Sequence, residues 1–395
     1  MSEKLERLKS QKNTIIIFRE TGKDIVISDL MYLLSANDND FIDYYCDFVN
    51  SLYNNDCVNI SKYILKTVLE DDNFYIRKSA RNEKIPQEMT ECLINELRFF
   101  QEISELTPKD FLDETDYDGF LPKWTNSPVD IVGSYLERIK LVHKYGYGQY
   151  AKYRMFILKK GAVAPVKYPD NQKLSELYGY ERERKAVIDN TLALVNGKRA
   201  QNVLLYGDAG TGKSSTVKAV VNEFADMGLR LVEITKEQLK DIPVIIEELS
   251  ENPLKFIIYV DDLSFTSGED CFGALKAFLE GSVSSKADNI AIYATSNRRH
   301  LIKETFSDRE GDDVHRNDTM QEMLSLSARF GLRVNFSRPD KKKYTDIAIE
   351  LAKAHGISLP EDEIILKAEQ FAISSGNGRS PRTAKQFVNQ LVMEM

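Results

Sequence analysis

NVLLYGDAGTGKSS, residues 202–215, is the stretch that decides the fold of this 395-residue chain. A short apolar run leads into a loop with the spacing G-x-x-x-x-G-K-S, and a helical stretch follows at once. The glycines let backbone N–H groups converge on phosphate oxygens, and the positive end of the following helix faces the same anion. We therefore expect a nucleotide-binding loop made of Gly207, Asp208, Ala209, Gly210, Thr211, Gly212, Lys213, Ser214 and Ser215.

Two residues of this loop have the chemistry to hold a nucleotide together with its metal ion. Lys213 is expected to reach the β- and γ-phosphates of ATP, and the Ser214 hydroxyl is expected to ligate Mg²⁺. The alternative is a glycine-rich turn that binds no ligand. A chance match in a strand–loop–helix context is rare, so the sequence favours nucleotide binding.

A second apolar run, FIIYV (residues 256–260), ends in paired carboxylates. In enzymes with a phosphate loop the first acid after such a strand helps to hold Mg²⁺, and Asp261 takes that place. Asp262 is then expected to orient and polarise the attacking water. Most ATPases have glutamate there, and aspartate is shorter by one methylene, about 1.5 Å, which the backbone or an extra water must make up. The alternative is an acidic strand end that faces solvent.

Polar residues after the remaining strands add candidates for the same site. The run IYATSN places Asn297 between the phosphate loop and the acidic strand end, where it is expected to contact the γ-phosphate or the water. A turn-forming asparagine is the alternative. Arg329 precedes the strand LRVNF and is expected on a subunit face, reaching the γ-phosphate of a neighbour. The alternative is a surface arginine paired within its own domain.

The C-terminal segment GNGRSPRTAKQ offers an arginine for the lid of the site. Ser380 and Pro381 are suited to a helix cap and a first helical position. Arg382 then falls in the first turn, where a lid helix could direct it to the phosphates. Arg379 competes for the same role.

Three regions are expected along the chain. Residues 1–165 show helical spacing and are expected to form a mainly helical partner-binding region. Residues 166–337 alternate short apolar runs with helical stretches, which predicts a parallel sheet covered on both faces. Residues 338–395 are purely helical and are expected to form a lid. The predicted class is therefore α/β with a phosphate-loop core.

Composition excludes several classes of protein. The net charge of −8 argues against non-specific nucleic-acid binding by the whole chain, although a local basic face is compatible with it. No run approaches the ~20 apolar residues of a membrane span, and the polar N-terminus does not resemble a secretory signal. The four cysteines lack metal or disulfide spacing, so we expect a cytoplasmic protein with reduced thiols.

Residues 138–160 contain seven Lys or Arg residues, no acid, and several interleaved aromatics. Such a stretch is typical of a nucleic-acid surface or, alternatively, of a solvated helix edge with aromatics packed beneath it. The second reading is favoured because the stretch has no defined geometry. The acidic loop 307–319, which includes His315, could be read as a metal site, but an exposed loop is favoured there.

The ordered set of motifs resembles the AAA+ ATPases, and within them the bacterial family catalogued as domain of unknown function eight-one-five. VDDLSF, YATSNRRHL and LSLSARFGL are similar to that family, and the resemblance covers roughly residues 145–395. It implies a five-stranded core, a helical lid and assembly into a ring or arc. It also implies that Tyr178 and Gly179 lie near the adenine, and that the Asp-Asp-Leu strand end is a family trait. Ala328 departs from the family, which usually has an acid before Arg329.

These observations favour an oligomeric, Mg²⁺-dependent AAA+ ATPase that remodels a protein or nucleoprotein partner. The alternative is an ATP-gated switch, similar to a helicase loader, with slow hydrolysis stimulated by a partner or by DNA. The basic stretch and Arg298–Arg299 favour that alternative weakly. A small-molecule kinase is a third class, which the arginine before the last strand and the helical tail fit less well.

Overall fold

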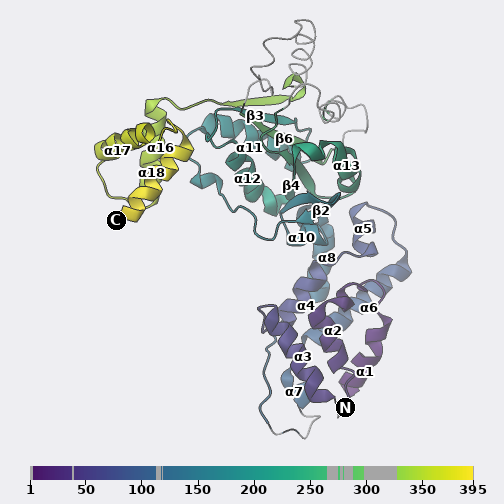
Figure 1. The fold of residues 1–395 in the computed structure, drawn as a ribbon. Helices are drawn as coiled ribbons and strands as arrows, with labels where there is room; N and C mark the ends of the chain where they lie inside the picture. Colours follow the sequence, from purple (N-terminus) through teal and green to yellow (C-terminus); the bar gives the residue numbers. More distant parts are fainter. Residues whose placement is uncertain are drawn as a thin grey trace. The chain divides into compact units, whose positions relative to one another are not determined.

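The computed structural model describes residues 3–37, 40–112, 117, 119–264, 275, 279, 288–297 and 327–394. The chain divides into two compact units, Met1–Lys152 and Tyr153–Met395 (Figure 1). No helix in these described ranges combines the length and the apolar character needed to cross a bilayer.

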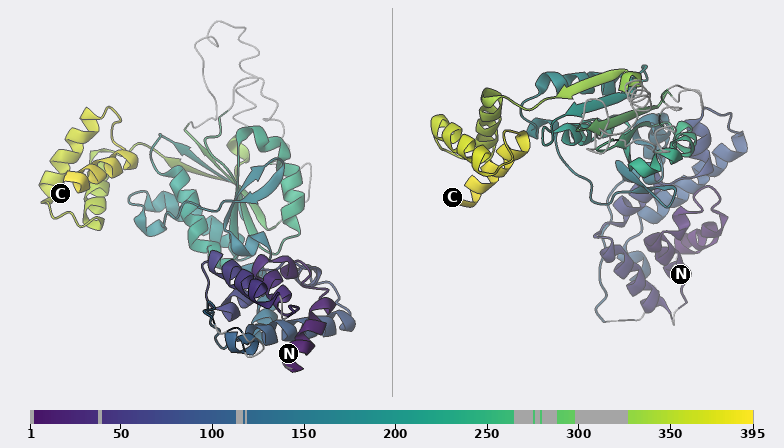
Figure 2. Two further views of the ribbon diagram at one scale, coloured as in Figure 1. Left: turned by 60° about the horizontal axis from the view of Figure 1, so that its bottom comes forward. Right: turned by 45° about the horizontal axis from the view of Figure 1, so that its top comes forward.

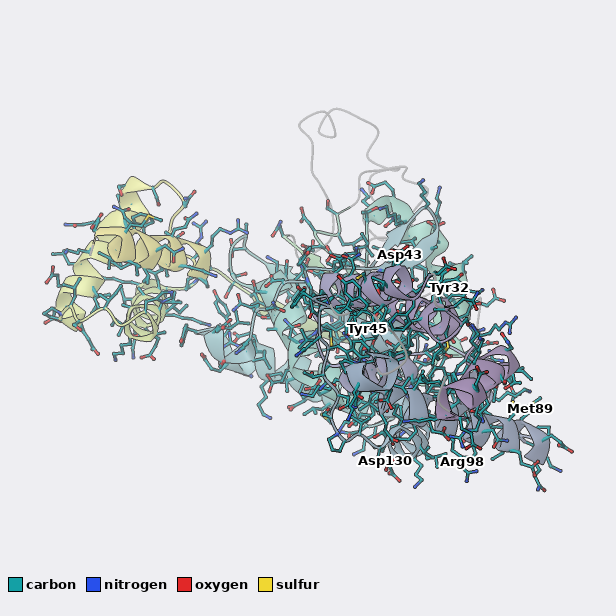
Figure 3. The ribbon with its side chains drawn as sticks, turned by 90° about the horizontal axis from the view of Figure 1, so that it is seen from below. Tyr32, Asp43, Tyr45, Met89, Arg98 and Asp130 are labelled. Atoms are coloured by element: carbon teal, nitrogen blue, oxygen red, sulfur yellow. The ribbon has the colours of Figure 1, made fainter. Side chains whose placement is uncertain are left out.

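The first unit is helical, as its spacing of apolar residues predicts. Buried aromatic and aliphatic side chains from most of its helices form one core, in which Tyr45 is fully buried and donates to the carbonyl of Pro122 at 2.8 Å (Figure 3). Side-chain caps start several helices, for example Asp24 before α2 and Asn59 before α4. The helices are α1 Glu3–Gln11, α2 Ile25–Leu33, α3 Phe41–Asn54, α4 Ile60–Leu69, α5 Phe74–Ala80, α6 Gln87–Ser104, α7 Pro108–Leu112, α8 Ile131–Lys140, α9 Val142–Tyr145 and α10 Gln149–Lys152.

The second unit is built on a twisted sheet (Figure 2). Its strands follow the order β2-β1-β4-β5-β6-β3-β7. All five strands expected from the apolar runs form, and they pair in parallel. Nearly all residues of the central strands β5 and β6 are buried, as expected for a parallel sheet between helices, whereas Arg333 and Asn335 of the edge strand β7 are exposed. The strands are β1 Met155–Lys159, β2 Ala162–Pro165, β3 Val203–Gly207, β4 Leu229–Ile234, β5 Lys255–Val260, β6 Ile290–Ser296 and β7 Leu332–Phe336.

The sheet has two strands more than the five that the family resemblance implied. Residues 155–165, expected within the helical N-terminal region, form the hairpin β1–β2, and β1 pairs in parallel with β4. Lys160 and Gly161 have φ of 52° and 79°, the left-handed values of a two-residue hairpin turn. The hairpin was not predicted because the apolar run MFIL is too short to indicate a strand next to the basic stretch that precedes it.

Helices surround the sheet and continue into the lid. α11 (Glu181–Val195) and α12 (Lys213–Phe224) pack against each other, and α13 (Ile242–Ser250) contacts β6. The lid consists of α16 (Lys341–Ala354), α17 (Glu361–Ser374) and α18 (Pro381–Glu394). Apolar residues of the lid and of the sheet belong to the same buried cluster. The class is therefore α/β with a phosphate-loop core and a helical lid, as predicted.

Candidate nucleotide site

The phosphate loop joins β3 to α12 and folds back around the Lys213 side chain. Gly207 has φ of 130°, and a Cβ atom there would lie 2.3 Å from the carbonyl oxygen of Phe336, so only glycine fits. Gly212, just before α12, has φ of 92°. The Lys213 ammonium donates to the carbonyl oxygens of Gly207 at 2.9 Å and Asp208 at 2.7 Å. The loop thus takes the bent form that the spacing of its glycines predicts.

Asn297 connects the Lys213 ammonium to the acidic end of β5. Lys213 donates to Asn297 Oδ1 at 3.0 Å, and Asn297 Nδ2 donates to Asp262 Oδ1 at 2.8 Å. Burial lowers the pKa of Lys213, while the carboxylates of Asp208, Asp262 and Asp261 act in the opposite direction. One amide side chain therefore brings together the expected phosphate-binding cation and the expected water-orienting carboxylate.

Asp261 lies at the end of β5 beside the first turn of α12. Its Oδ1 accepts hydrogen bonds from Ser214 Oγ at 2.8 Å, from the Tyr259 hydroxyl at 2.7 Å and from Thr295 Oγ1. Burial would raise the pKa of Asp261, but the three hydroxyl donors outweigh it, and the pKa lies below its ordinary value. Mg²⁺ prefers such oxygen ligands and takes others from phosphates and water. Ser214 and Asp261 therefore fit the metal position.

Asp262 has a different environment from Asp261. Its φ of 50° is left-handed, which is uncommon for a residue with a side chain and costs conformational energy. Its N–H donates to Thr295 Oγ1 at 2.9 Å, which fixes this turn, and its side chain lines a cavity. Strained backbone of this kind is often maintained at functional sites.

The lid helix α18 begins at the phosphate loop. The N–H of Arg382 donates to the carbonyl of Gly210 at 3.1 Å, and Arg382 lines the cavity. Arg379, which competed for the same role, instead forms two hydrogen bonds with Glu369, at 2.9 and 2.7 Å. Geometry therefore brings Arg382, and not Arg379, to the loop.

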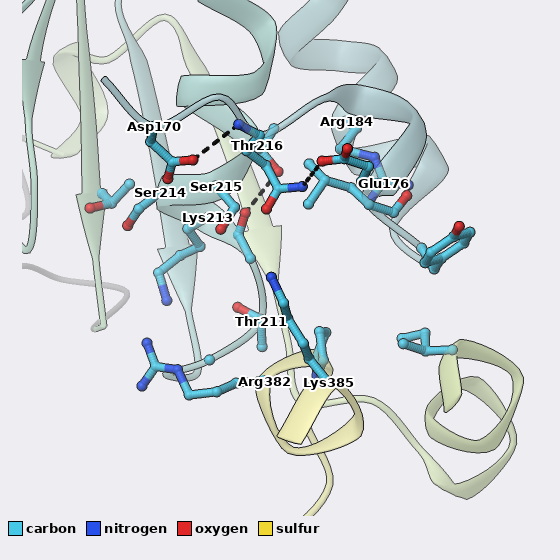
Figure 4. A pocket seen from close by; sticks show the side chains of 18 of the residues that line it. Asp170, Glu176, Arg184, Thr211, Lys213, Ser214, Ser215, Thr216, Arg382 and Lys385 are labelled. Carbon is cyan, nitrogen blue, oxygen red and sulfur yellow. Dashed lines mark hydrogen bonds between the residues drawn. The ribbon is translucent and has the colours of Figure 1, made fainter. Parts of the chain in front are cut away.

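A cavity of about 930 Å³ lies between the phosphate loop, the strand ends and the lid (Figure 4). Tyr178 lines it from the segment before α11. Gly179 has φ of 70°, and a Cβ atom there would lie 2.7 Å from Ile347 Cδ1, so glycine lets this segment approach α16. Arg329 is exposed in the short helical segment before β7 and is not among the described residues that line the cavity.

Several lining residues carried no signal in the sequence. Glu176, Arg184 and Lys385 face the cavity from three separate segments (Figure 4). Thr295 Oγ1 donates to the carboxylate of Asp261 and accepts a hydrogen bond from the backbone N–H of Asp262, but in the sequence it belonged only to the polar end of a strand. These side chains meet only when the chain is folded, so no local spacing marks them.

Asp208, a residue of the phosphate loop, also binds the segment that follows β7. Its Oδ2 accepts a hydrogen bond from the N–H of Arg338 at 2.8 Å, immediately after β7. The Tyr180 hydroxyl donates to the carbonyl of Ser337 at 2.6 Å, and its ring stacks on Phe336 at 5.3 Å. The connection from the sheet to the lid is therefore held from two sides.

In the basic stretch 138–160, several aromatic side chains are packed in the protein interior, as the second of the two interpretations predicted. Tyr147, Tyr150 and Phe156 are buried, and Arg138 lies over the ring of Tyr145 at 4.7 Å. Buried rings are not accessible for stacking on nucleic-acid bases. Arg298–Arg299 and the acidic loop 307–319 lie outside the described residues.

Comparisons with known proteins place this chain in a family. The profile of the family described as "Protein of unknown function (DUF815)" matches residues 149–395, more than half of the chain. No curated protein matches it. The structure resembles the Thermotoga maritima RuvB Holliday junction branch migration motor, with 15% identity and a TM-score of 0.36, over 55% of this chain and 63% of that one. A mutant form of the same protein has 15% identity and a TM-score of 0.38, over 55% and 64%. This chain thus spans less than two thirds of those chains.

Proposed function

This chain belongs to the family of proteins of unknown function DUF815, and we propose that it is a Mg²⁺-dependent ATPase that remodels a protein or nucleoprotein partner. The link from Lys213 through Asn297 to Asp262 is the observation that carries the proposal. It joins the groups that a phosphoryl transfer to water requires: a cation for the phosphates and a carboxylate for the nucleophile.

The cavity would bind ATP with its phosphates at the loop and its adenine near Tyr178 and Gly179. Lys213 would then exchange its loop carbonyls for β- and γ-phosphate oxygens. Ser214 and Asp261 would hold the metal, and bound Mg²⁺ neutralises charge on the phosphate oxygens. The Ser214 hydroxyl would turn its proton away from Asp261 so that both oxygens face the cation.

Asp262 would accept a hydrogen bond from the attacking water and polarise it. Asn297 would hold that carboxylate in place and respond to the γ-phosphate through its contact with Lys213. Arg382 would couple the phosphates to the lid, because its backbone is already bonded to the loop.

Arg329 would complete the site of a neighbouring subunit. It is exposed, and arginines supplied in this way stabilise charge in the transition state. The protein would therefore act as a homo-oligomer.

One observation favours a second candidate function, an ATP-gated switch with slow hydrolysis. Asn297 already donates to Oδ1 of Asp262, so one of the acceptor positions of this short side chain is used before any water binds. Slow turnover that rises when a partner or DNA is added would distinguish the switch from an autonomous ATPase.

The first test is ATP hydrolysis by the full chain with Mg²⁺ at increasing protein concentration. We expect turnover per subunit to rise with concentration and to vanish in Lys213→Ala. Arg379→Ala is the matched control, since Arg379 pairs with Glu369 and should leave turnover within about twofold. An Lys213→Ala protein that binds and hydrolyses ATP normally would refute the proposal.

The role of Arg329 has a sharper test by mixing two inactive proteins. Arg329→Ala retains Asp262, and Asp262→Asn retains Arg329. If Arg329 acts across the interface, mixed oligomers contain intact sites, and the mixture should regain turnover that neither protein has alone. An additive mixture would show that Arg329 does not act across an interface.

A further inference from the structure

The lid helix α18 presents two cations to the cavity. Arg382 and Lys385 are three residues apart, so they lie one turn apart on the same side of the helix. Both line the cavity, and Figure 4 shows both side chains extending from α18. Within the described ranges, no hydrogen bond or ion pair joins Lys385 to another residue. An ammonium group is therefore available on the lid side of the cavity.

The two cations serve different parts of the cavity. Burial lowers the pKa of Lys213, and the charge of Arg382 lowers it further. Arg382 is thus close to the β- and γ-phosphate position that Lys213 marks. In Figure 4 Lys385 lies on the other side of Thr211 from Arg382, which is also the side on which Glu176 and Arg184 lie.

That side of the cavity leads to the segment where the adenine is expected. A nucleotide whose γ-phosphate is at Lys213 and whose base is near Tyr178 has its α-phosphate between them. The position of Lys385 suits this phosphate, and its positive charge matches the charge of the ligand.

We propose that Lys385 is a nucleotide-binding residue of the lid that contacts the α-phosphate, the phosphate that ATP and ADP share. This inference rests on the proposed function of the site. Arg382 would then contribute to binding of ATP over ADP, and Lys385 would hold the lid on either nucleotide. The lid would stay engaged after the γ-phosphate leaves.

The test is equilibrium binding of ATP and of ADP, each with Mg²⁺, to the full chain carrying Asp262→Asn to slow hydrolysis. In this background Lys385→Ala should weaken both nucleotides by a similar factor, about three- to tenfold. Lys385→Arg should restore most of the affinity, since it keeps the charge. Arg382→Ala should weaken ATP more than ADP. Lys367→Ala, an exposed lysine of α17 paired with Glu363, is the matched control and should change neither.

Unchanged affinities in Lys385→Ala would overturn the inference, and so would a loss confined to ATP, which would assign Lys385 to the γ-phosphate. If the Asp262→Asn protein binds neither nucleotide, the proposed function fails together with the inference. Normal binding by that protein with no effect of Lys385→Ala removes the inference alone.

Discussion

Two hydrogen-bonded carboxylates, one in each unit, show how the choice of hydrogen-bond donors separates a structural acid from one suited to a ligand. Glu96 in α6 is 4% exposed and accepts hydrogen bonds at 2.8–3.0 Å from the backbone N–H groups of residues 16–18. Asp261 at the end of β5 accepts hydrogen bonds from three side-chain hydroxyls.

The difference lies in what the donors can do next. A backbone N–H cannot turn away without moving the chain. The carboxylate of Glu96 therefore keeps its hydrogen bonds to the segment before α2 and is not free to bind another ligand. A hydroxyl can rotate its proton and present a lone pair instead. Asp261 and Ser214 can therefore pass from a hydrogen bond with each other to a shared cation without backbone movement. Hydroxyl donors keep the carboxylate ionised, and they can be replaced by a cation without backbone movement.

The largest effect on ATP turnover is expected from a substitution of Asp262, the acid that follows Asp261. Asp262→Asn keeps the size of the side chain but removes the charge that polarises water, so turnover should fall by about a hundredfold or more. ATP affinity should stay within about threefold, since Asp262 is not expected to hold phosphate or metal. Steady-state turnover and equilibrium ATP binding on the same preparation give the two numbers. Retained turnover would assign the water to another residue.

A second prediction concerns the hydroxyls that surround Asp261. Tyr259→Phe removes one donor from this carboxylate with little change in shape, and loss of such an outer partner typically weakens metal binding about tenfold or more. The Mg²⁺ concentration for half-maximal turnover should rise accordingly, with maximal turnover less affected.

The neighbouring strand provides the control. Tyr293→Phe also removes a buried hydroxyl, but that hydroxyl contacts Asn190 and Thr191 instead of Asp261. Its Mg²⁺ dependence should match that of the unsubstituted protein. Equal shifts in both variants would mean that the effect comes from the core and not from Asp261.

The same contrast explains how far the sequence could predict this site. The loop at Lys213 and the acids at Asp261 and Asp262 are encoded by short contiguous spacing, so the sequence alone marks them as candidates. The bridge through Asn297 was foreseen only as a contact with phosphate or water, because its partners are 84 and 35 residues away. Lys385 could not be proposed from the sequence, since its place in the cavity depends on where the lid packs.

In the N-terminal unit the expected effect is on stability alone. Glu96→Gln replaces one acceptor oxygen by an NH₂ group that faces backbone N–H donors, which should cost about 2 kcal/mol of unfolding free energy. Trp124, the single tryptophan, is buried in this unit, so its fluorescence during urea unfolding reports on it. The control, Glu91→Gln on the exposed side of α6, should change stability by no more than about 0.5 kcal/mol. If Glu96→Gln also lost no more than about 0.5 kcal/mol, the hydrogen bonds from residues 16–18 to Glu96 would not contribute to the stability of this unit.

The smallest expected effect is a pH dependence of stability caused by Asp71, a carboxylate of the N-terminal unit that is 9% exposed. Its pKa shift is opposite to that of Asp261. Burial raises the pKa of Asp71, and its bonds from Thr21 and Asn73 lower it without reversing the shift. A raised pKa contributes stability below the unfolded value, about 3.9, and that stability is lost as pH rises through the folded value. Asp261, with its lowered pKa, has the opposite sign.

Asp71→Asn removes this titration, so the stability of the variant relative to the parent should improve between pH 4.5 and pH 7, measured by Trp124 fluorescence in urea. Asp47→Asn, an exposed position of α3, should show no such change with pH. A difference that stays constant with pH would mean that the bonds from Thr21 and Asn73 fully offset burial, as the hydroxyls do at Asp261. The distinction between the two acids would then lie only in whether their donors can be exchanged for a cation.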